Sequence, residues 1–140
     1  MIREFKVNDL DTVMSLWLDT NIQAHDFIPQ SYWMENYNNV KEMLPDATIY
    51  VYENKDVIQG FVGLMDNYIA GIFVEVSCQS MGLGKALLDY IKANHSELTL
   101  QVYKKNVRAV TFYLRESFVV SKEQQDENTG ETELVMAWTK

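Results

Sequence analysis

The segment from Gln79 to Lys85, Gln-Ser-Met-Gly-Leu-Gly-Lys, has the residue spacing with the clearest chemical meaning in this chain. Two glycines one residue apart allow a tight backbone turn and a close approach to a ligand, because they lack a Cβ atom. An apolar run precedes the segment, and an amphipathic run at 83–93 follows it. A helix that begins here directs unpaired N–H groups at the turn. The pattern predicts a phosphate or diphosphate site, and its alternative is a purely structural strand-to-helix turn.

The two best-known nucleotide signatures do not fit this segment. Leu87 stands where the dinucleotide fingerprint has its third glycine, and Ala86 follows Lys85 where the P-loop has Ser or Thr. Lys85 therefore has two readings, as a cation that reaches the same anion or as a solvated side chain. A ligand class other than that of the Rossmann or P-loop folds is needed.

Length and composition predict one folded domain over residues 1–140, because 47% of the 140 residues are hydrophobic and 23% are charged. The net charge of −8 argues against a nucleic-acid partner. No apolar run approaches the roughly 20 residues of a membrane span, and the first residues lack the layout of a secretory signal. Cys78 is the only cysteine, so neither an intramolecular disulfide nor a cysteine zinc cluster can form. We expect a cytoplasmic protein with no metal and no membrane partner.

Hydrophobic periodicity predicts the order β-α-α-β-β-β-α-β-α-β-β. The expected strands are residues 2–5, 48–53, 57–65, 68–76, 98–103, 118–124 and 133–138, and the expected helices follow Asn8 or Asp9 and span 31–44, 83–93 and 107–115. Asn8 or Asp9 is expected to cap the first helix, and Ser31 with Glu35 the second. A meander followed by two crossover helices predicts an α/β (mixed α+β) domain. Its six- to seven-stranded mixed sheet is mostly antiparallel, with helices on both faces.

A second pattern follows the fifth expected strand, where Asn106, Ala109, Phe112 and Tyr113 have the spacing N-x-x-A-x-x-F-Y. With the pattern Q/R-x-x-G-x-G/A at 79–84, the whole chain resembles the GNAT superfamily of N-acetyltransferases. It is most similar to small single-domain bacterial members of the YiaC and YjaB type, partly through the run His-Asp-Phe at 25–27. Two departures are Val76, where many members have proline, and Ser117, which replaces the glycine of a Gly-Phe pair and predicts a less tight turn.

The resemblance implies that acetyl-CoA is the co-substrate. Backbone amides would hold its diphosphate at Gln79, Ser80, Met81, Gly82, Leu83, Gly84 and Lys85. The main chain of Phe73, Val74 and Val76 would pair with the pantetheine arm where the fourth and fifth strands splay apart, although these residues can equally be simple core. An N–H group near Val74 would polarise the thioester carbonyl. Asn106 would orient the arm or cap its helix, and Ala109 would leave room for the cofactor.

The same resemblance implies that Tyr113 is the catalytic acid. Attack of an amine on a thioester expels a thiolate, and a positioned phenol can protonate that sulfur. The incoming amine must first lose a proton, and Glu75, His25 and bulk water are the alternative bases. A solvated strand-end charge and a packing residue are the structural alternatives for Glu75 and His25.

Acceptor contacts are expected from the connection between the first two helices and from the start of the fourth strand. The candidates are His25, Asp26, Phe27, Tyr32, Trp33 and Tyr68, and their alternative is packing between the helices. Cys78 has no established His partner, so direct transfer in a ternary complex is expected rather than an acetyl-cysteine route.

The sequence therefore predicts an acetyl-CoA-dependent N-acetyltransferase that acts on a primary amine, either a protein lysine or a small molecule. Two alternatives stay open: a non-catalytic acyl-CoA sensor on the same fold, and an interaction module whose glycine loop is only structural. The expected oligomeric state is a monomer or a homodimer.

Overall fold

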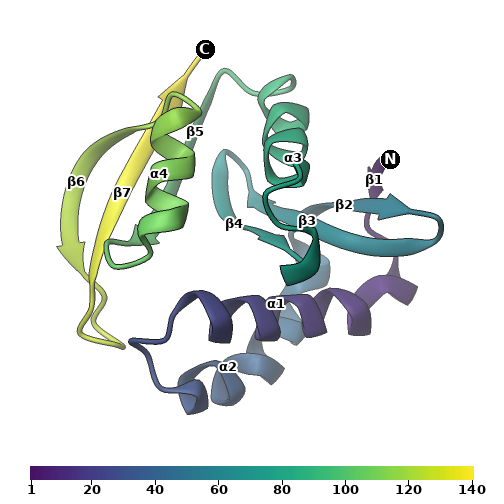
Figure 1. The fold of residues 1–140 in the computed structure, drawn as a ribbon, viewed down its shortest axis with the longest axis horizontal. Helices are drawn as coiled ribbons and strands as arrows, with labels where there is room; N and C mark the ends of the chain where they lie inside the picture. Colours follow the sequence, from purple (N-terminus) through teal and green to yellow (C-terminus); the bar gives the residue numbers. More distant parts are fainter.

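A seven-stranded mixed sheet forms the middle layer of this computed structural model, which describes residues 1–140 (Figure 1). The strands are β1 (Ile2–Glu4), β2 (Thr48–Asn54), β3 (Val57–Met65), β4 (Tyr68–Val74), β5 (Glu97–Tyr103), β6 (Val119–Gln125) and β7 (Thr132–Thr139). The helices are α1 (Leu10–Ala24), α2 (Gln30–Met43), α3 (Leu83–Lys92) and α4 (Val107–Arg115). The order in the sheet is β1-β2-β3-β4-β5-β7-β6, and only β4 and β5 are parallel. The predicted fold class is confirmed.

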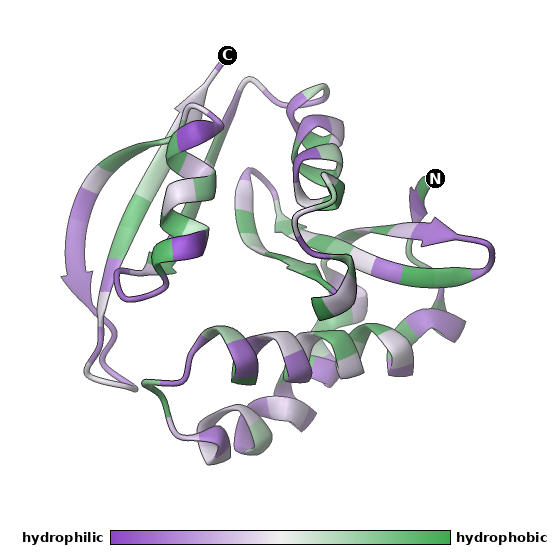
Figure 2. Ribbon diagram, in the orientation of Figure 1, coloured by the Kyte–Doolittle hydropathy of each residue, from purple (hydrophilic) through white to green (hydrophobic).

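Two hydrophobic clusters lie on opposite faces of the sheet. The larger, of 13 buried residues, joins α3 and α4 to alternate residues of β3, β5 and β7, such as Leu98 and Leu100. The smaller, of 10 buried residues, joins α1 and α2 to β2 and to Phe61 of β3. Phe61 and Val62 are neighbours in one strand but belong to different clusters, as the alternation of side chains along a strand requires. In Figure 2 the turns of α1 and α4 alternate between hydrophobic and hydrophilic colours, as expected of helices with one buried face.

The pairing of β4 with β5 is short. It consists of Tyr68 with Thr99 and Ile69 with Leu100, although the strands run on to Val74 and Tyr103. The later residues of both strands therefore lack partners across this gap. The sheet divides here into an N-terminal part, β1 to β4, and a C-terminal part, β5 to β7.

Two expectations about helix starts are wrong. The carboxylate of Asp9 does not cap α1, because it accepts the backbone N–H of Lys6 (2.8 Å) and two hydrogen bonds from the guanidinium of Arg3. Helix α2 begins at Gln30 after Pro29, so the Ser31 capping box does not form. Proline fixes φ near −65° and has no N–H, which suits it to a position just before a helix.

None of the helices has the length and apolar content needed to cross a membrane.

Strand β4 ends two residues earlier than expected. Beyond Val74 the chain forms a 3-10 turn at Val76–Cys78, and the carboxylate of Glu75 accepts the backbone N–H of Ser77 (2.9 Å). This local hydrogen bond competes with further strand pairing. The shortened strand leaves room for the glycine-containing loop before α3.

The turn after α4 is tight, contrary to the expectation from Ser117. The N–H of Phe118 donates to the carbonyl of Tyr113 (2.9 Å), and Ser117 has a φ of 75°. This is the left-handed C-terminal cap that usually holds glycine. A non-glycine residue in this conformation costs about 1–2 kcal/mol. Ser117 adopts this conformation, and the folded state is destabilised by about that amount.

We expect Ser117→Gly to raise the free energy of unfolding by about 0.5–1 kcal/mol, because relief of the left-handed strain exceeds the entropy that glycine gains in the unfolded chain. Urea unfolding followed by circular dichroism measures the change. Ser121→Gly is the matched control, because Ser121 lies in β6 without a positive φ and its replacement should destabilise. A destabilised Ser117→Gly variant would contradict this account of the turn.

Candidate active site

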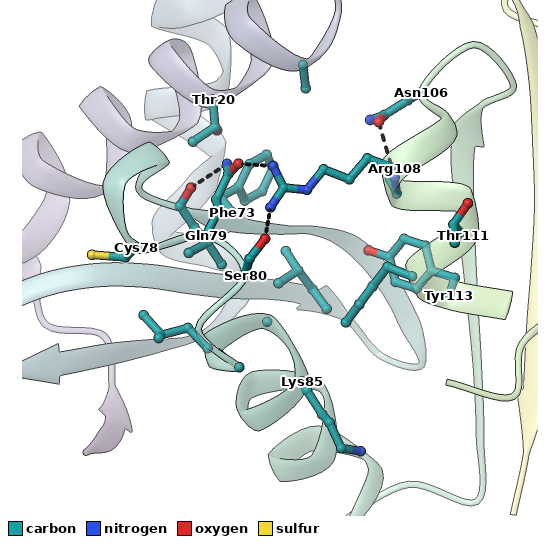
Figure 3. A pocket seen from close by; sticks show the side chains of 18 of the residues that line it. Thr20, Phe73, Cys78, Gln79, Ser80, Lys85, Asn106, Arg108, Thr111 and Tyr113 are labelled. Carbon is teal, nitrogen blue, oxygen red and sulfur yellow. Dashed lines mark hydrogen bonds between the residues drawn. The ribbon is translucent and has the colours of Figure 1, made fainter. Parts of the chain in front are cut away.

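A pocket of about 620 Å³ opens beside the unpaired end of β4 (Figure 3). Three parts of the chain face each other across it: the end of α1, the outer half of β4 with the following loop, and one side of α4. The lining residues are Thr20, Asn21, Ala24, His25, Ile72, Phe73, Val74, Cys78, Gln79, Ser80, Gly82, Leu83, Gly84, Lys85, Asn106, Arg108, Ala109, Thr111, Phe112, Tyr113 and Arg115. The structure thus brings the two sequence patterns, 79–84 and 106–113, to one cavity.

The loop before α3 presents a row of unpartnered backbone donors. None of the N–H groups from Ser80 to Lys85 donates a hydrogen bond within the chain, and the first bond of α3 runs from Ala86 N to Gly82 O (3.0 Å). Gly82 has a φ of 87° and would meet nothing within 4 Å if it carried a Cβ. The predicted donor at Gln79 differs, because its N–H donates to the carbonyl of Val76 (3.3 Å). The loop therefore fits a diphosphate, with its donors beginning at Ser80.

The open edge of β4 consists of the backbone groups of Ile72 and Val74. The N–H of Glu75 donates to Gln59 of β3 (2.8 Å), and antiparallel pairs alternate between bonded and non-bonded residues. Phe73 therefore pairs with Phe61 of β3, whereas Val74 points its N–H and carbonyl at the gap. Because the backbone groups of Phe73 face β3, the predicted pairing of the Phe73 main chain with the pantetheine arm is disfavoured. Val76 lies in the 3-10 turn outside the pocket lining.

The cation that faces the loop is Arg108 rather than Lys85. The ammonium of Lys85 pairs with Glu116 (2.9 Å) and Asp89 (3.3 Å), and these partners raise the pKa of Lys85. Arg108 has no carboxylate partner, and its guanidinium donates to Gln79 Oε1 and to Ser80 Oγ (2.9 Å). Figure 3 shows the Arg108 side chain reaching from α4 to the loop, while Lys85 points away from it.

Asn106 connects the two helical walls of the pocket. Its Oδ1 accepts the N–H of Ala109 (3.3 Å), which caps α4, and its Nδ2 lies 3.1 Å from His25 Nε2. The other ring nitrogen of His25, Nδ1, lies 3.0 Å from the carbonyl of Asn21 and must donate to it. Nε2 is then the acceptor of the amide, so His25 is held as a neutral imidazole with no lone pair facing the pocket.

Burial lowers the pKa of His25, and the hydrogen bond to Asn21 opposes that shift only in part. The ring stacks on Trp33 with 5.1 Å between centroids and contacts Phe27 and Tyr103 edge to face. These contacts favour the packing alternative for His25 over the general base.

The hydroxyl of Tyr113 makes no hydrogen bond within the chain, although the residue is only 7% exposed. Its ring packs against Phe112 and Phe118, and its oxygen points across the pocket from α4 in Figure 3. Burial, and secondarily the charge of Tyr68, raise the pKa of Tyr113 well above its usual value. A protonated, unpartnered phenol is therefore available to a ligand in the pocket.

Glu75 and Cys78 are placed less favourably for catalysis. The Glu75 carboxylate accepts from the N–H and hydroxyl of Ser77, and these bonds lower the pKa of Glu75. Glu75 does not line the pocket, which weakens its candidacy as a base. Cys78 does line it, but its sulfur lies near the Ser77 hydroxyl (3.8 Å) and the Glu75 carboxylate, and no histidine is hydrogen-bonded to it.

Most of the predicted acceptor residues lie outside the main pocket. Phe27 and Tyr32 line a second, smaller hollow of about 240 Å³, together with Glu35 and residues 128–129. Asp26 is exposed and lines neither pocket. Trp33 is buried against Trp17. The hydroxyl of Tyr68 reaches Gln101 Oε1 of β5 (3.5 Å). His25 alone of this group lines the main pocket.

Sequence reasoning missed several lining residues. They are Thr20, Asn21 and Ala24 of α1, Ile72 of β4, and Arg108, Thr111, Phe112 and Arg115 of α4. The four on α4 have the spacing i, i+3, i+4, i+7, which places them on one side of a helix. That spacing was a usable signal, since Ala109 and Tyr113 border the same side.

Comparison with known proteins identifies the family of this chain. Residues 23–140 match the acetyltransferase (GNAT) domain. The chain is 35% identical to the peptidyl-lysine N-acetyltransferase YiaC of Escherichia coli, over 99% of this chain and 96% of that protein. It is 26% identical to the peptidyl-lysine N-acetyltransferase YjaB of Escherichia coli, over 92% and 88%. The solution structure of apo YjaB superposes with a TM-score of 0.88, over 99% of this chain and 96% of that one.

The chain belongs to the GNAT acetyltransferase family. It is an N-acetyltransferase, an enzyme that moves an acetyl group from acetyl-CoA to a primary amine. The predicted resemblance to small single-domain bacterial members is confirmed.

The environment of His25 has a consequence for stability. A folded-state pKa below the unfolded value of about 6.5 means that the unfolded chain takes up the proton more readily. The resulting stability is present above about pH 6.5 and is lost as the pH falls through the folded pKa. We expect the difference in unfolding free energy between the wild type and His25→Gln to shrink as the pH falls from about 7.5 to 5. Urea titrations across this range test it, and a constant difference would contradict the buried neutral imidazole.

Proposed function

We propose that this enzyme acetylates lysine side chains of proteins, with acetyl-CoA bound in the pocket between α1 and α4. The observation that carries the proposal is a single cavity that combines the unpartnered donors of residues 80–85, the open edge of β4 and the unpartnered phenol of Tyr113. The names of YiaC and YjaB support a lysine acceptor in proteins. Cytoplasmic location and a monomeric or homodimeric state stay predictions from the sequence.

In this proposal the chain binds the cofactor by its backbone. The N–H groups of Ser80 to Lys85 and the positive end of the α3 dipole hold the diphosphate. Ile72 and Val74 pair with the pantetheine arm as a missing strand would, and Ala109 leaves space beside α4. The bound thioester supplies the acetyl group, and in this proposal the Val74 N–H polarises its carbonyl.

Tyr113 delivers the proton that the departing sulfur needs. Burial raises the pKa of Tyr113, so the phenol stays protonated throughout the neutral range. The same burial disfavours a thiolate anion and so raises the pKa of the thiol as well, which offsets the rise in the phenol pKa and keeps proton transfer from the phenol to the sulfur accessible. The lone pair of His25 Nε2 accepts from Asn106, and the Glu75 carboxylate accepts from Ser77, so neither group is free to act as a base. We therefore propose that the acceptor amine loses its proton to water.

The acceptor enters beside the connection between α1 and α2. Phe27 and Tyr32 border the second hollow, and the exposed carboxylates of Asp26 and Glu35 lie on the same connection and the first turns of α2. Negative charge at this entrance favours a cationic lysine over a neutral or acidic group.

We expect Tyr113→Phe to lower kcat by about 10²-fold or more, because a positioned general acid contributes about 10²–10⁴-fold to a rate. The affinity for acetyl-CoA should stay within about twofold, since the ring remains to pack. Thiol release with a lysine-peptide panel measures the rate, and isothermal titration calorimetry measures the affinity.

Tyr90→Phe is the matched control, because Tyr90 lies on the outer side of α3 against Tyr50 and outside the pocket. It should leave both quantities unchanged. If the wild type binds acetyl-CoA but acetylates no amine in a broad panel, the sensor alternative replaces this proposal.

A further inference from the structure

The Val74 carbonyl at the open edge of β4 is already hydrogen-bonded, by a side chain of the protein itself. Gln79 Nε2 donates to this oxygen (3.1 Å). A primary amide N–H on a backbone carbonyl is the same kind of contact that an amide of the pantetheine arm would make. The Gln79 side chain therefore occupies one of the positions that the arm needs.

Arg108 holds Gln79 in this position. Its guanidinium donates to Gln79 Oε1, so the two ends of the Gln79 amide are fixed by Arg108 and by Val74. A second donation, to Ser80 Oγ (2.9 Å), fixes Arg108 over the loop. Figure 3 shows these contacts spanning the pocket from α4 to the loop.

The partners of Arg108 are weak ones for a guanidinium. An amide oxygen and a hydroxyl are neutral, whereas charge-assisted bonds to phosphate are shorter, stronger and often bidentate. Arg108 takes part in none of the ion pairs of this chain, although the net charge is −8. An anion held by the unpartnered N–H groups that begin at Ser80 would lie next to Arg108. A diphosphate there would draw Arg108 away from Gln79.

We propose that Arg108 and Gln79 form a latch that keeps the pantetheine edge of β4 closed until a diphosphate occupies the loop. Once Arg108 turns to the diphosphate, Gln79 loses its orienting partner and the Val74 carbonyl becomes available. The latch couples the two ends of the cofactor through protein side chains, and it selects thioesters of CoA over thioesters of shorter pantetheine carriers. It rests on the proposed CoA site.

The sign of the mutational effects tests the latch. Arg108→Ala should strengthen the binding of pantetheine, which has no phosphate, about two- to threefold, and weaken the binding of CoA about tenfold or more. Gln79→Ala should strengthen pantetheine binding about three- to tenfold, because one competing hydrogen bond is removed. NMR titration of labelled protein measures pantetheine affinity, and calorimetry measures CoA affinity.

A second measurement uses inorganic diphosphate as a separate ligand. Saturating diphosphate should raise the affinity of the wild type for pantetheine, and this coupling should vanish in Arg108→Ala and in Gln79→Ala. Gln124→Ala is the matched control, because Gln124 lies in β6 and bonds Glu133 (2.8 Å) outside the pocket. It should change neither affinity nor the coupling.

The outcomes separate the latch from the site on which it rests. If the wild type binds neither CoA nor diphosphate, the proposed CoA site fails. If CoA binds but both variants weaken or leave unchanged the binding of pantetheine, Gln79 is a ligand or a structural residue and the latch is overturned. Thermal unfolding of each variant identifies a general loss of structure, which would weaken both ligands together.

Discussion

Parallel pairing between β4 and β5 stops after Ile69 and Leu100, although both strands continue. Backbone groups in a sheet are normally satisfied by the neighbouring strand, so an interrupted pair leaves donors and acceptors available to a ligand. The helices α1 and α4 wall this interruption, the loop before α3 lies at its outer end, and Tyr113 reaches into it. Every part of the site is therefore arranged around hydrogen bonds that the sheet does not make with itself.

The side chains around this gap divide into those that fix its shape and those that remain available. Asn106 joins His25 to the first turn of α4, and Glu116, itself 8% exposed, accepts from Lys85 and so joins α3 to the end of α4. These polar groups satisfy each other. Tyr113 and the loop N–H groups have no such partners, and Arg108 has only neutral ones. The side chains that fix the shape of the gap are thus hydrogen-bonded to one another, whereas the proposed ligand-binding groups are not.

Sequence patterns predicted the sheet, the loop and the phenol because each has a local signal: strand periodicity, glycine spacing and a motif on one helix. The role of Lys85 could not be predicted, since its partner Glu116 lies 31 residues away. The choice between Phe73 and Val74 as the open edge depends on the register with β3, which the sequence does not contain. The Ser31 cap was plausible locally, but Pro29 set the start of α2. Long-range partners and strand register account for most of what was missed.

The interrupted pairing also marks a seam in the domain. Beyond Leu100 the N-terminal and C-terminal parts of the sheet share no backbone pairing, and His25 and Asn106 meet across the far end of the opening. The core on the α3 and α4 face spans both parts, whereas the core on the other face belongs mainly to the N-terminal part. A ligand bound in this seam would contact both parts of the sheet and link them. The cooperativity of thermal unfolding would then depend on the bound ligand as well as on the polypeptide.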